Sequence, residues 1–489
     1  MPDYILAFGI VAIVLCVTAL ASGVVERSPI SYPLIFLGLG FLLGEGALNL
    51  VEMGPHSPIL EIVAALTLSL VLFLDAVKLQ LDQLKSRWAV PALVLGPGTA
   101  TIIGLGAVGL AKITGFSWTM AFLGGAVLAS TDPVVLREIV RDHRIPRSVR
   151  QILKIEAGTN DIVVLPVVLV LIAVATRQAG DVQGWAVFMA KLLLLGPFIG
   201  FGVGGAGSWL MNQIDRRMSI RREHQAFYGV GLVLAAYAAA AAAGGDGFLA
   251  AFAAGLAVVL LNQSLCDCFM EYGEVTSEMA MLLAFVLFGI VLSGMVGSVA
   301  FVPALGLAAL VIFVIRPAVL ALVLARAKMS WEAHAFVCWF GPRGLNSLLL
   351  ALLAVQAEVP GGELLLATVG IVVTASVLVH GASAVPLSVW YGKRTLQIAY
   401  AEERESTAAG LFGHSESDVP RVTPQELNSR MISSELPGGD PPIVLDVRTR
   451  SSYEHDGFHI PGDTRLLPDE VVEWGATYAG KGLVVAYCT

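Results

Sequence analysis

Hydrophobic residues make up 56% of the 489-residue chain and charged residues only 14%, a composition that excludes a water-soluble globular protein of this length. The net charge of −8 lies entirely after residue 394, because residues 1–394 hold 23 acidic and 23 basic side chains whereas residues 395–489 hold 15 acidic and 7 basic ones. This acidic tail offers no basic surface, so we expect no nucleic-acid partner.

Apolar runs of about 20 residues, the length that crosses a bilayer core as a helix, recur from Met1 to Arg394. The first run follows Met-Pro-Asp directly, without a positively charged start or a small-residue cleavage site, and therefore reads as a retained span and not a signal peptide. We expect an all-α polytopic membrane protein. The predicted spans number thirteen and lie at residues 4–24, 30–50, 58–77, 89–112, 117–139, 152–175, 185–212, 226–243, 247–263, 279–296, 300–325, 333–356 and 364–390.

Basic residues are distributed unevenly between the loops on the two sides of the predicted membrane. Eighteen fall on one side, whereas the other side has little beyond Lys112 and Arg177. Because loops rich in Lys and Arg stay in the cytoplasm, this asymmetry places the N-terminus outside and the C-terminal tail inside. We expect the membrane to be a plasma (inner) membrane.

Residues 395–420 differ in composition from the segments on either side. They are rich in Glu, Ser, Ala and Gly, which is typical of a linker. The sequence therefore predicts a transmembrane domain at 1–394, a linker at 395–420 and a small soluble domain at 421–489.

Ionisable side chains recur inside the apolar spans. Lipid does not solvate them, so each must face a cavity or a partner, and each is a candidate functional residue. They are Asp75 in the third span, Asp132 in the fifth, Glu156 and Asp161 in the sixth, Arg316 in the eleventh and Arg343 in the twelfth.

The fifth span contains Ser130-Thr131-Asp132-Pro133. Pro133 lacks an N–H and frees the carbonyl of Ala129, while its ring disfavours helix at Asp132, so we predict a helix break here. Transporters use the carbonyls and helix ends of such breaks to hold ions at the membrane midplane. The alternative is a packing kink, but the adjacent Thr and Asp favour an ion site.

The sixth span places polar residues on two faces of one helix. Glu156 lies beside Asn160 at helical spacing, whereas Asp161 lies beside Ala157. A buried Arg needs a carboxylate, which makes Arg343 the expected partner of Glu156 and leaves Asp161 to bind a transported cation. The alternative is that these carboxylates belong to a structural ion-pair network.

Taken together, these residues resemble the cation/proton antiporter family, of the electroneutral sodium/proton exchanger type. The resemblance covers residues 1–394. It rests on four motifs in this order and spacing: Phe73-Leu74-Asp75 followed by Lys78-Leu79-Gln80-Leu81, Ser130-Thr131-Asp132-Pro133, Glu156-Ala157-Gly158-Thr159-Asn160-Asp161, and Gly341-Pro342-Arg343-Gly344.

The resemblance implies a fold with two inverted repeats, crossed broken helices in a core domain, and a separate domain through which two chains form a homodimer. It implies that Asp161 carries the cation and the proton, with Asp75 and the Thr131 backbone as further cation ligands. Asp132 and Asn160 are further candidates for cation or proton binding. No cofactor is implied, only a transported monovalent cation and a proton.

The resemblance also implies that Glu156 pairs with Arg343 close to Asn160. One residue departs from the family pattern: position 157, often a hydroxyl residue in relatives, is Ala157 here. Sodium is the expected cation, with lithium and potassium as alternatives. Because a partly desolvated carboxylate can bind either a cation or a proton, the two compete for Asp161, and one cation should exchange for one proton.

The soluble tail resembles the rhodanese-like fold. The matching segments are Ile443-Val444-Leu445-Asp446-Val447-Arg448, Tyr453, Gly457, His459-Ile460-Pro461-Gly462 and Val484-Val485-Ala486-Tyr487-Cys488. In that family the Cys takes up sulfane sulfur and the loop after it cradles the sulfur. Here the sequence ends at Thr489, so we expect an incomplete α/β domain in which Cys488 is an unreactive thiol.

Three other functions compete with cation/proton exchange. A membrane-tethered rhodanese-type sulfurtransferase or sulfur sensor would use Cys488. A symporter of organic anions would need a larger and less acidic site than Asp75, Asp132 and Asp161 provide. A cation channel would need a continuous pore, whereas broken helices around one exchangeable acid favour alternating access. The sequence therefore predicts a secondary transporter and not an enzyme.

Overall fold

The structure is a computed structural model of the chain, and the residues that it describes are 31–78, 93–142, 144–177, 181–262, 269–397, 424–434, 442–448, 458–478 and 483–487, with a few single positions between them. The first predicted span, apart from a few single positions, and Cys488 lie outside the described residues. So does the predicted linker, apart from its first three positions.

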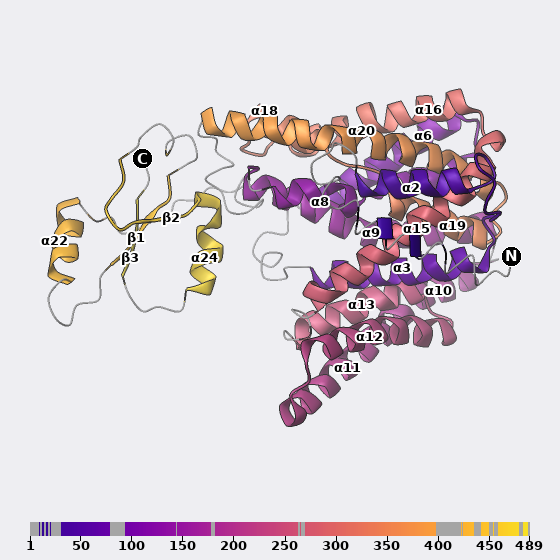
Figure 1. Cartoon of the computed structure of the whole chain (residues 1–489). Helices are drawn as coiled ribbons and strands as arrows, with labels where there is room; N and C mark the ends of the chain where they lie inside the picture. The colour runs from indigo at the N-terminus through magenta and orange to yellow at the C-terminus, as the bar shows by residue number, and fades with distance from the viewer. Residues whose placement is uncertain are drawn as a thin grey trace.

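Most of the described chain is a bundle of helices (Figure 1). Their bounds in chain order are α2 (Tyr32–Leu43), α3 (Pro58–Val77), α6 (Thr99–Ile113), α7 (Trp118–Ala129), α8 (Pro133–Arg141), α9 (Arg147–Ala175), α10 (Val182–Ala190), α11 (Gly196–Met218), α12 (Arg222–Ala242), α13 (Gly247–Leu261), α15 (Glu274–Met295), α16 (Phe301–Leu310), α17 (Arg316–Val323), α18 (Trp331–Trp339), α19 (Leu345–Gln356) and α20 (Gly362–Gln397).

Short π-helical turns interrupt three of these spans, at Val94–Gly98, Lys191–Leu195 and Val311–Ile315. A proline lies in or just after each turn, namely Pro97, Pro197 and Pro317. Proline removes one backbone N–H and its ring pushes the preceding turn apart, which widens the helix locally without ending it.

In the described part of the chain, nine helices are long and apolar enough to cross a membrane, and α2, α13 and α19 are shorter apolar helices. The predicted class, a mostly helical polytopic membrane protein, is confirmed, while the count of thirteen spans stays a prediction. Large apolar side chains that face outward agree with a lipid surround: Phe198, Phe227, Val302 and Leu322 are each more than 70% exposed.

The helices form two groups that pack mainly within themselves. The first group consists of α2, α3, α11, α12, α13 and α15, and the second of α6 to α9 and α16 to α20. Figure 1 shows α11, α12 and α13 together at the lower edge of the bundle and α16, α18 and α20 at the upper edge. Helices α3 and α9 meet across the boundary between the groups.

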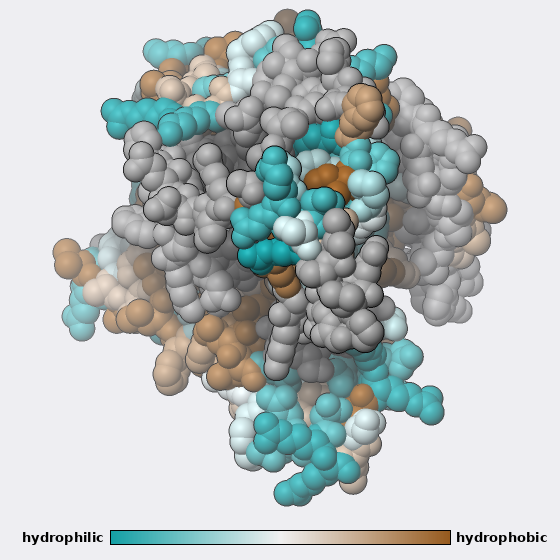
Figure 2. All heavy atoms as spheres, turned by 90° about the vertical axis from the view of Figure 1, so that its left-hand side faces the viewer, coloured by the Kyte–Doolittle hydropathy of each residue, from teal (hydrophilic) through white to brown (hydrophobic). Residues whose placement is uncertain are grey.

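The tail contains a three-stranded parallel sheet, with strands β1 (Ile443–Asp446), β2 (Thr464–Arg465) and β3 (Val484–Tyr487) in the order β2-β1-β3. Helices α22 (Pro424–Ser434) and α24 (Val471–Thr477) lie on opposite sides of it (Figure 1). At the end of the molecule that carries the tail, hydrophilic residues occupy much of the described surface (Figure 2). A small α/β unit is therefore present, but its rhodanese-like identity stays a prediction.

Close packing of α2 against α15 generates the first prediction. A side chain at Gly40 would overlap the backbone carbonyl of Val286, so we expect Gly40→Val to push the two helices apart and to destabilise the protein by about 1–3 kcal/mol. Thermal unfolding in detergent measures this. Gly38→Val, on the same helix, is the matched control because no atom lies within 4 Å of the added Cβ. Equal melting temperatures for the two variants would contradict the packing argument.

Candidate ion site at two crossed helix breaks

The fifth span is broken where the sequence predicts it. Helix α7 ends at Ala129 and α8 begins at Pro133, and the backbone at Ser130 and Asp132 is extended. The predicted break is confirmed. It leaves the last carbonyls of α7 and the first N–H groups of α8 inside the bundle, where each needs a partner.

A second break divides the twelfth span. Helix α18 ends at Trp339 and α19 begins at Leu345, with non-helical backbone between them. The two breaks touch, because the backbone N–H of Asp132 donates to the carbonyl of Pro342 at 2.9 Å. The crossed pair of broken helices that the resemblance implies is therefore present.

The carboxylate of Asp132 caps both outgoing half-helices. One oxygen accepts from the backbone N–H of Val134 at 2.8 Å, and the other accepts from that of Leu345 at 2.7 Å. A side chain at Gly344 would overlap this carboxylate, which explains the glycine there. Since both oxygens bind helix N-termini, Asp132 is held as a link between the breaks.

Two arginines occupy the opposite, carbonyl ends of the breaks. Arg343 donates to the carbonyls of Ala129 and Ser130 at the end of α7, at 3.3 and 3.2 Å. Arg316, from α17, donates to carbonyls at the end of α18. A guanidinium carries several donors and a positive charge, both of which suit the negative end of a helix.

The buried ion pair differs from the predicted one. Glu156 receives two hydrogen bonds from Arg316, at 3.2 and 2.7 Å, and both side chains are almost fully buried. The expected pair of Glu156 with Arg343 is therefore corrected to Glu156 with Arg316. The sequence shows two buried arginines, but only the fold shows that Arg343 is directed to the carbonyls of α7.

Asp161 lies beside the breaks and binds two neutral donors. One carboxylate oxygen accepts from the Ser130 hydroxyl at 2.5 Å, and the other accepts from the Asn346 amide. Its side chain is 2% exposed. Sequence reasoning missed both donors, although Asn346 lies two residues after a motif of the resemblance and is a polar residue within a largely apolar segment.

The remaining predicted residues lie around the same point. Asn160 donates to the carbonyl of Ala129 at 2.6 Å and accepts from the Thr99 hydroxyl at 3.2 Å. The hydroxyl of Thr131 donates to the carbonyl of Glu156 at 3.5 Å. The structure therefore brings these predicted residues together, but it uses their side chains to hold the helices in place.

Asp75 approaches from the other helix group. It lies near the end of α3, is 5% exposed, and has one oxygen without a hydrogen-bond partner among the described residues. A Cβ added at Gly158 of α9 would lie 3.9 Å from its other oxygen. Asp75 thus faces the helix that carries Asp161, with the capacity to bind a positively charged ligand.

The described residues contain no group of three or more His, Cys, Asp or Glu side chains with the geometry to hold a metal ion. The described acids near the breaks are instead distributed over three elements: Asp75 lies on α3, Asp132 in the break after α7, and Glu156 and Asp161 on α9. Such an arrangement suits a cation that is bound in transit between these elements. It does not resemble a closed site for a resident metal.

Comparison with known proteins shows similarity to one family of membrane transporters. Residues 11–390 match the family model described as "Sodium/hydrogen exchanger, transmembrane". The chain is 25% identical over 393 residues to the K(+)/H(+) antiporter NhaP of Alkalimonas amylolytica, covering 79% of this chain and 66% of that protein. It is 27% identical over 385 residues to the K(+)/H(+) antiporter NhaP2 of Shewanella sp. (strain ANA-3), covering 77% of this chain and 65% of that protein.

The fold is also similar to a solved structure, that of the sodium proton antiporter MjNhaP1 from Methanocaldococcus jannaschii at pH 8. The TM-score is 0.61 at 19% identity, covering 80% of this chain and all of that one. The match to the curated relatives spans about two thirds of their length, 66% and 65% for the two proteins above.

Pairing of Glu156 with Arg316 generates the second prediction. Arg316→Met leaves a buried carboxylate without its cation, so we expect a loss of about 3–5 kcal/mol of stability, measured by thermal unfolding. The double variant Arg316→Met with Glu156→Met removes the unpaired charge and should recover that part of the loss, while the carbonyls at the end of α18 still lack their donor. If the single variant is as stable as the double variant, the two residues are not coupled.

Proposed function

This chain belongs to the sodium/hydrogen exchanger family, and we propose that it exchanges a monovalent cation for a proton across the membrane, with both binding in turn to Asp161. One observation carries the proposal: Asp161 is buried at the crossed breaks, and the hydrogen-bond donors to it among the described residues, Ser130 and Asn346, are neutral. By contrast, Glu156 is neutralised by Arg316.

Competition at one carboxylate couples the two ions. A buried carboxylate without an ion-pair partner favours binding of a positive ion, and either a proton or a metal cation satisfies that need. The two cannot bind the same oxygen atoms together. Each molecule of carrier would therefore return with a proton after it has released a cation on the other side.

Alternating access would follow from movement of one helix group against the other. Asp75 belongs to α3 in the first group, whereas Asp161 belongs to α9 in the second group. A change at the boundary between α3 and α9 would expose the site to one side and then the other. Transporters built from two packed bundles operate in this manner.

Sodium is the cation that we propose first, and potassium is the alternative because the curated relatives carry the name K(+)/H(+) antiporter. Position 157 provides no hydroxyl oxygen as a ligand, which bears on the choice between them. Proteoliposomes supplied with each cation in turn would decide it.

The homodimer, the plasma membrane and the cytoplasmic tail remain predictions from the sequence. No observation on the described residues favours a sulfurtransferase.

The third prediction concerns the loss of the negative charge of Asp161. We expect Asp161→Asn to abolish cation-dependent proton movement in everted vesicles, because an amide does not bind a proton in competition with a cation. Expression should be retained, which size-exclusion chromatography checks. Asp181→Asn is the matched control: Asp181 caps α10 at the bundle surface, and Asn caps equally well. Full exchange in Asp161→Asn would refute the site.

Charge balance generates the fourth prediction. Asn160, next to Asp161, carries no charge, so one cation should exchange for one proton with no net charge moved. Collapse of the membrane potential with valinomycin and potassium should leave the initial rate of exchange in sodium-loaded liposomes unchanged. A sustained, potential-dependent current on a solid-supported membrane would show that a second group titrates, and Asp132 would be the first to examine.

A further inference from the structure

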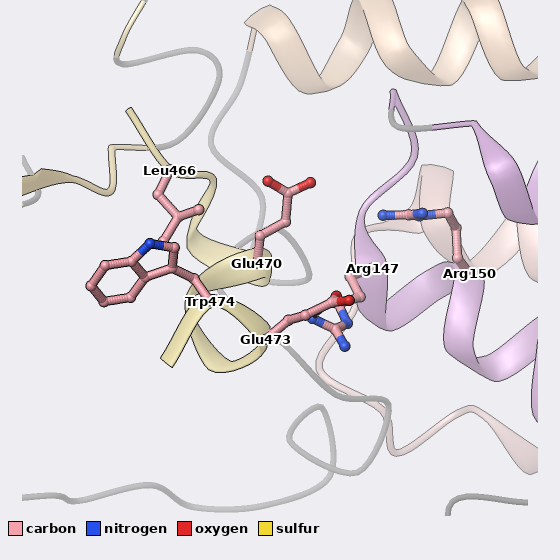
Figure 3. Close-up of a pocket in the computed structure, with 6 residues that line it drawn as sticks. All are labelled: Arg147, Arg150, Leu466, Glu470, Glu473 and Trp474. Carbon is pink, nitrogen blue, oxygen red and sulfur yellow. Dashed lines mark ion pairs between the residues drawn. The ribbon is translucent and has the colours of Figure 1, made fainter. Parts of the chain in front are cut away.

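Helix ends in this fold are held by side chains from distant parts of the chain. At the start of α9, the carboxylate of Asp469 caps the helix, because the backbone N–H of Arg147 donates to it at 2.6 Å. Figure 3 shows the cavity of about 340 Å³ beside this contact, which is lined by residues of α9 and of the tail. The second break is held in a similar manner, but inside the bundle and by α20.

The carbonyl end of α18 shows the first bond to α20. Arg316 donates to three carbonyls on either side of Trp339, namely those of Val337, Cys338 and Phe340. The carbonyl of Trp339 itself lies 3.1 Å from Nε2 of His380 on α20. A carbonyl oxygen can only accept, so Nε2 carries the ring proton and donates. Four successive carbonyls at this buried helix end therefore have donors.

The other side of the break is bound by Ser376, which lies four residues before His380 on α20. Its hydroxyl oxygen accepts from the backbone N–H of Arg343 at 2.7 Å and lies 3.1 Å from Nδ1 of His380. In a ring with its proton on Nε2, Nδ1 accepts from this hydroxyl. The carbonyl of Ser376 is also near Nδ1, at 2.9 Å, because it is the helical partner of the His380 backbone N–H. One chain of hydrogen bonds thus joins Arg343 to Trp339 through Ser376 and His380.

The two side chains on α20 are buried in a largely apolar segment. Ser376 is 0% exposed and His380 2% exposed. A buried polar group costs free energy unless it has a partner, and here the partners are the two sides of the break. Ser383 lies on the same face of α20 and accepts from the indole N–H of Trp339 at 2.9 Å. Positions 376, 380 and 383 therefore form one polar stripe that binds the break.

We propose that Ser376 and His380 are positioning residues of the ion site, which set the geometry of the second break. This proposal rests on the exchange function proposed above. The break carries two groups of the site, because Arg343 binds the carbonyl end of α7 and Asn346 donates to Asp161. Helices α18, α19 and α20 belong to the same helix group, so movement between the groups can leave these bonds intact. Ser376 and His380 thus act on the affinity for the cation through the break.

The cation dependence of exchange in proteoliposomes tests this role, with sodium or potassium, whichever the parent protein transports. We expect His380→Ala to raise the KM for the cation by about 10- to 100-fold, the range for loss of a residue that orients a metal ligand, with a smaller change in kcat. His380→Gln should stay closer to the parent than His380→Asn, because the Gln amide nitrogen can take the place of Nε2 and the Asn amide nitrogen that of Nδ1.

Thr374→Ala is the matched control for these variants. The Thr374 hydroxyl donates to the carbonyl of Gly370 within α20, so its loss should leave the KM unchanged. An unchanged KM in His380→Ala, or equal KM values in His380→Gln and His380→Asn, would overturn the positioning role.

Hydrogen exchange in detergent tests the hold on the break without transport. We expect Ser376→Ala to speed amide exchange at Arg343 by about 2- to 10-fold, the factor for one lost hydrogen bond, whereas Ser376→Thr keeps the hydroxyl and should stay near the parent. Unchanged exchange in Ser376→Ala would overturn the hold, and faster exchange with an unchanged KM would overturn the positioning role. If the parent transports neither cation, the exchange function fails and the positioning role with it, while amide exchange still decides whether α20 holds the break.

Discussion

Burial of interrupted backbone is the constraint on which this structure depends. Each break leaves N–H groups and carbonyls at membrane depth, where lipid offers them no partner. The breaks solve the problem for each other: Asp132 from one break caps the helix that leaves the other, and Arg343 from the second break binds the carbonyls of the first. Because some of the partners come from the other broken helix, neither break is fully satisfied unless both are formed; Arg316 of α17 binds the carbonyls at the end of α18.

The buried charged residues around the breaks are of two kinds. Asp132, Glu156, Arg316 and Arg343 bind helix ends or one another. Asp161 stands apart, since its hydrogen bonds come from a hydroxyl and an amide that bring no charge. A carboxylate supported in this manner is positioned but not neutralised, which is the state that a cation or a proton can use. The structural acids and the acid that we propose to exchange ions are thus distinguished by their partners and not by their burial.

How far the sequence could predict this site depended on how local the signal was. The break at Ser130–Pro133 could be predicted because proline acts on its own helix and the preceding residue. The choice between Arg316 and Arg343 as the partner of Glu156 could not, because it depends on how α17 and the second break are placed around α9. Asn346 was missed for the same reason: nothing in its neighbours along the chain shows that it faces Asp161. The cap from Asp469 joins residues 322 positions apart and has no local signal at all.

Asn160 shows how the fold and the charge balance are linked. Its amide N–H₂ donates to the carbonyl of Ala129 while its oxygen accepts from Thr99, so the residue must offer a donor and an acceptor at once. An ionised Asp has only acceptors and would set an anion against the carbonyl of Ala129. To keep the contact, an acid here would have to carry a proton in the arrangement seen, and it would then bring a second titrating group beside Asp161. If Asp161 exchanges the ions as proposed, the neutral residue that completes the end of α7 is therefore also the residue that limits the exchanged charge to one.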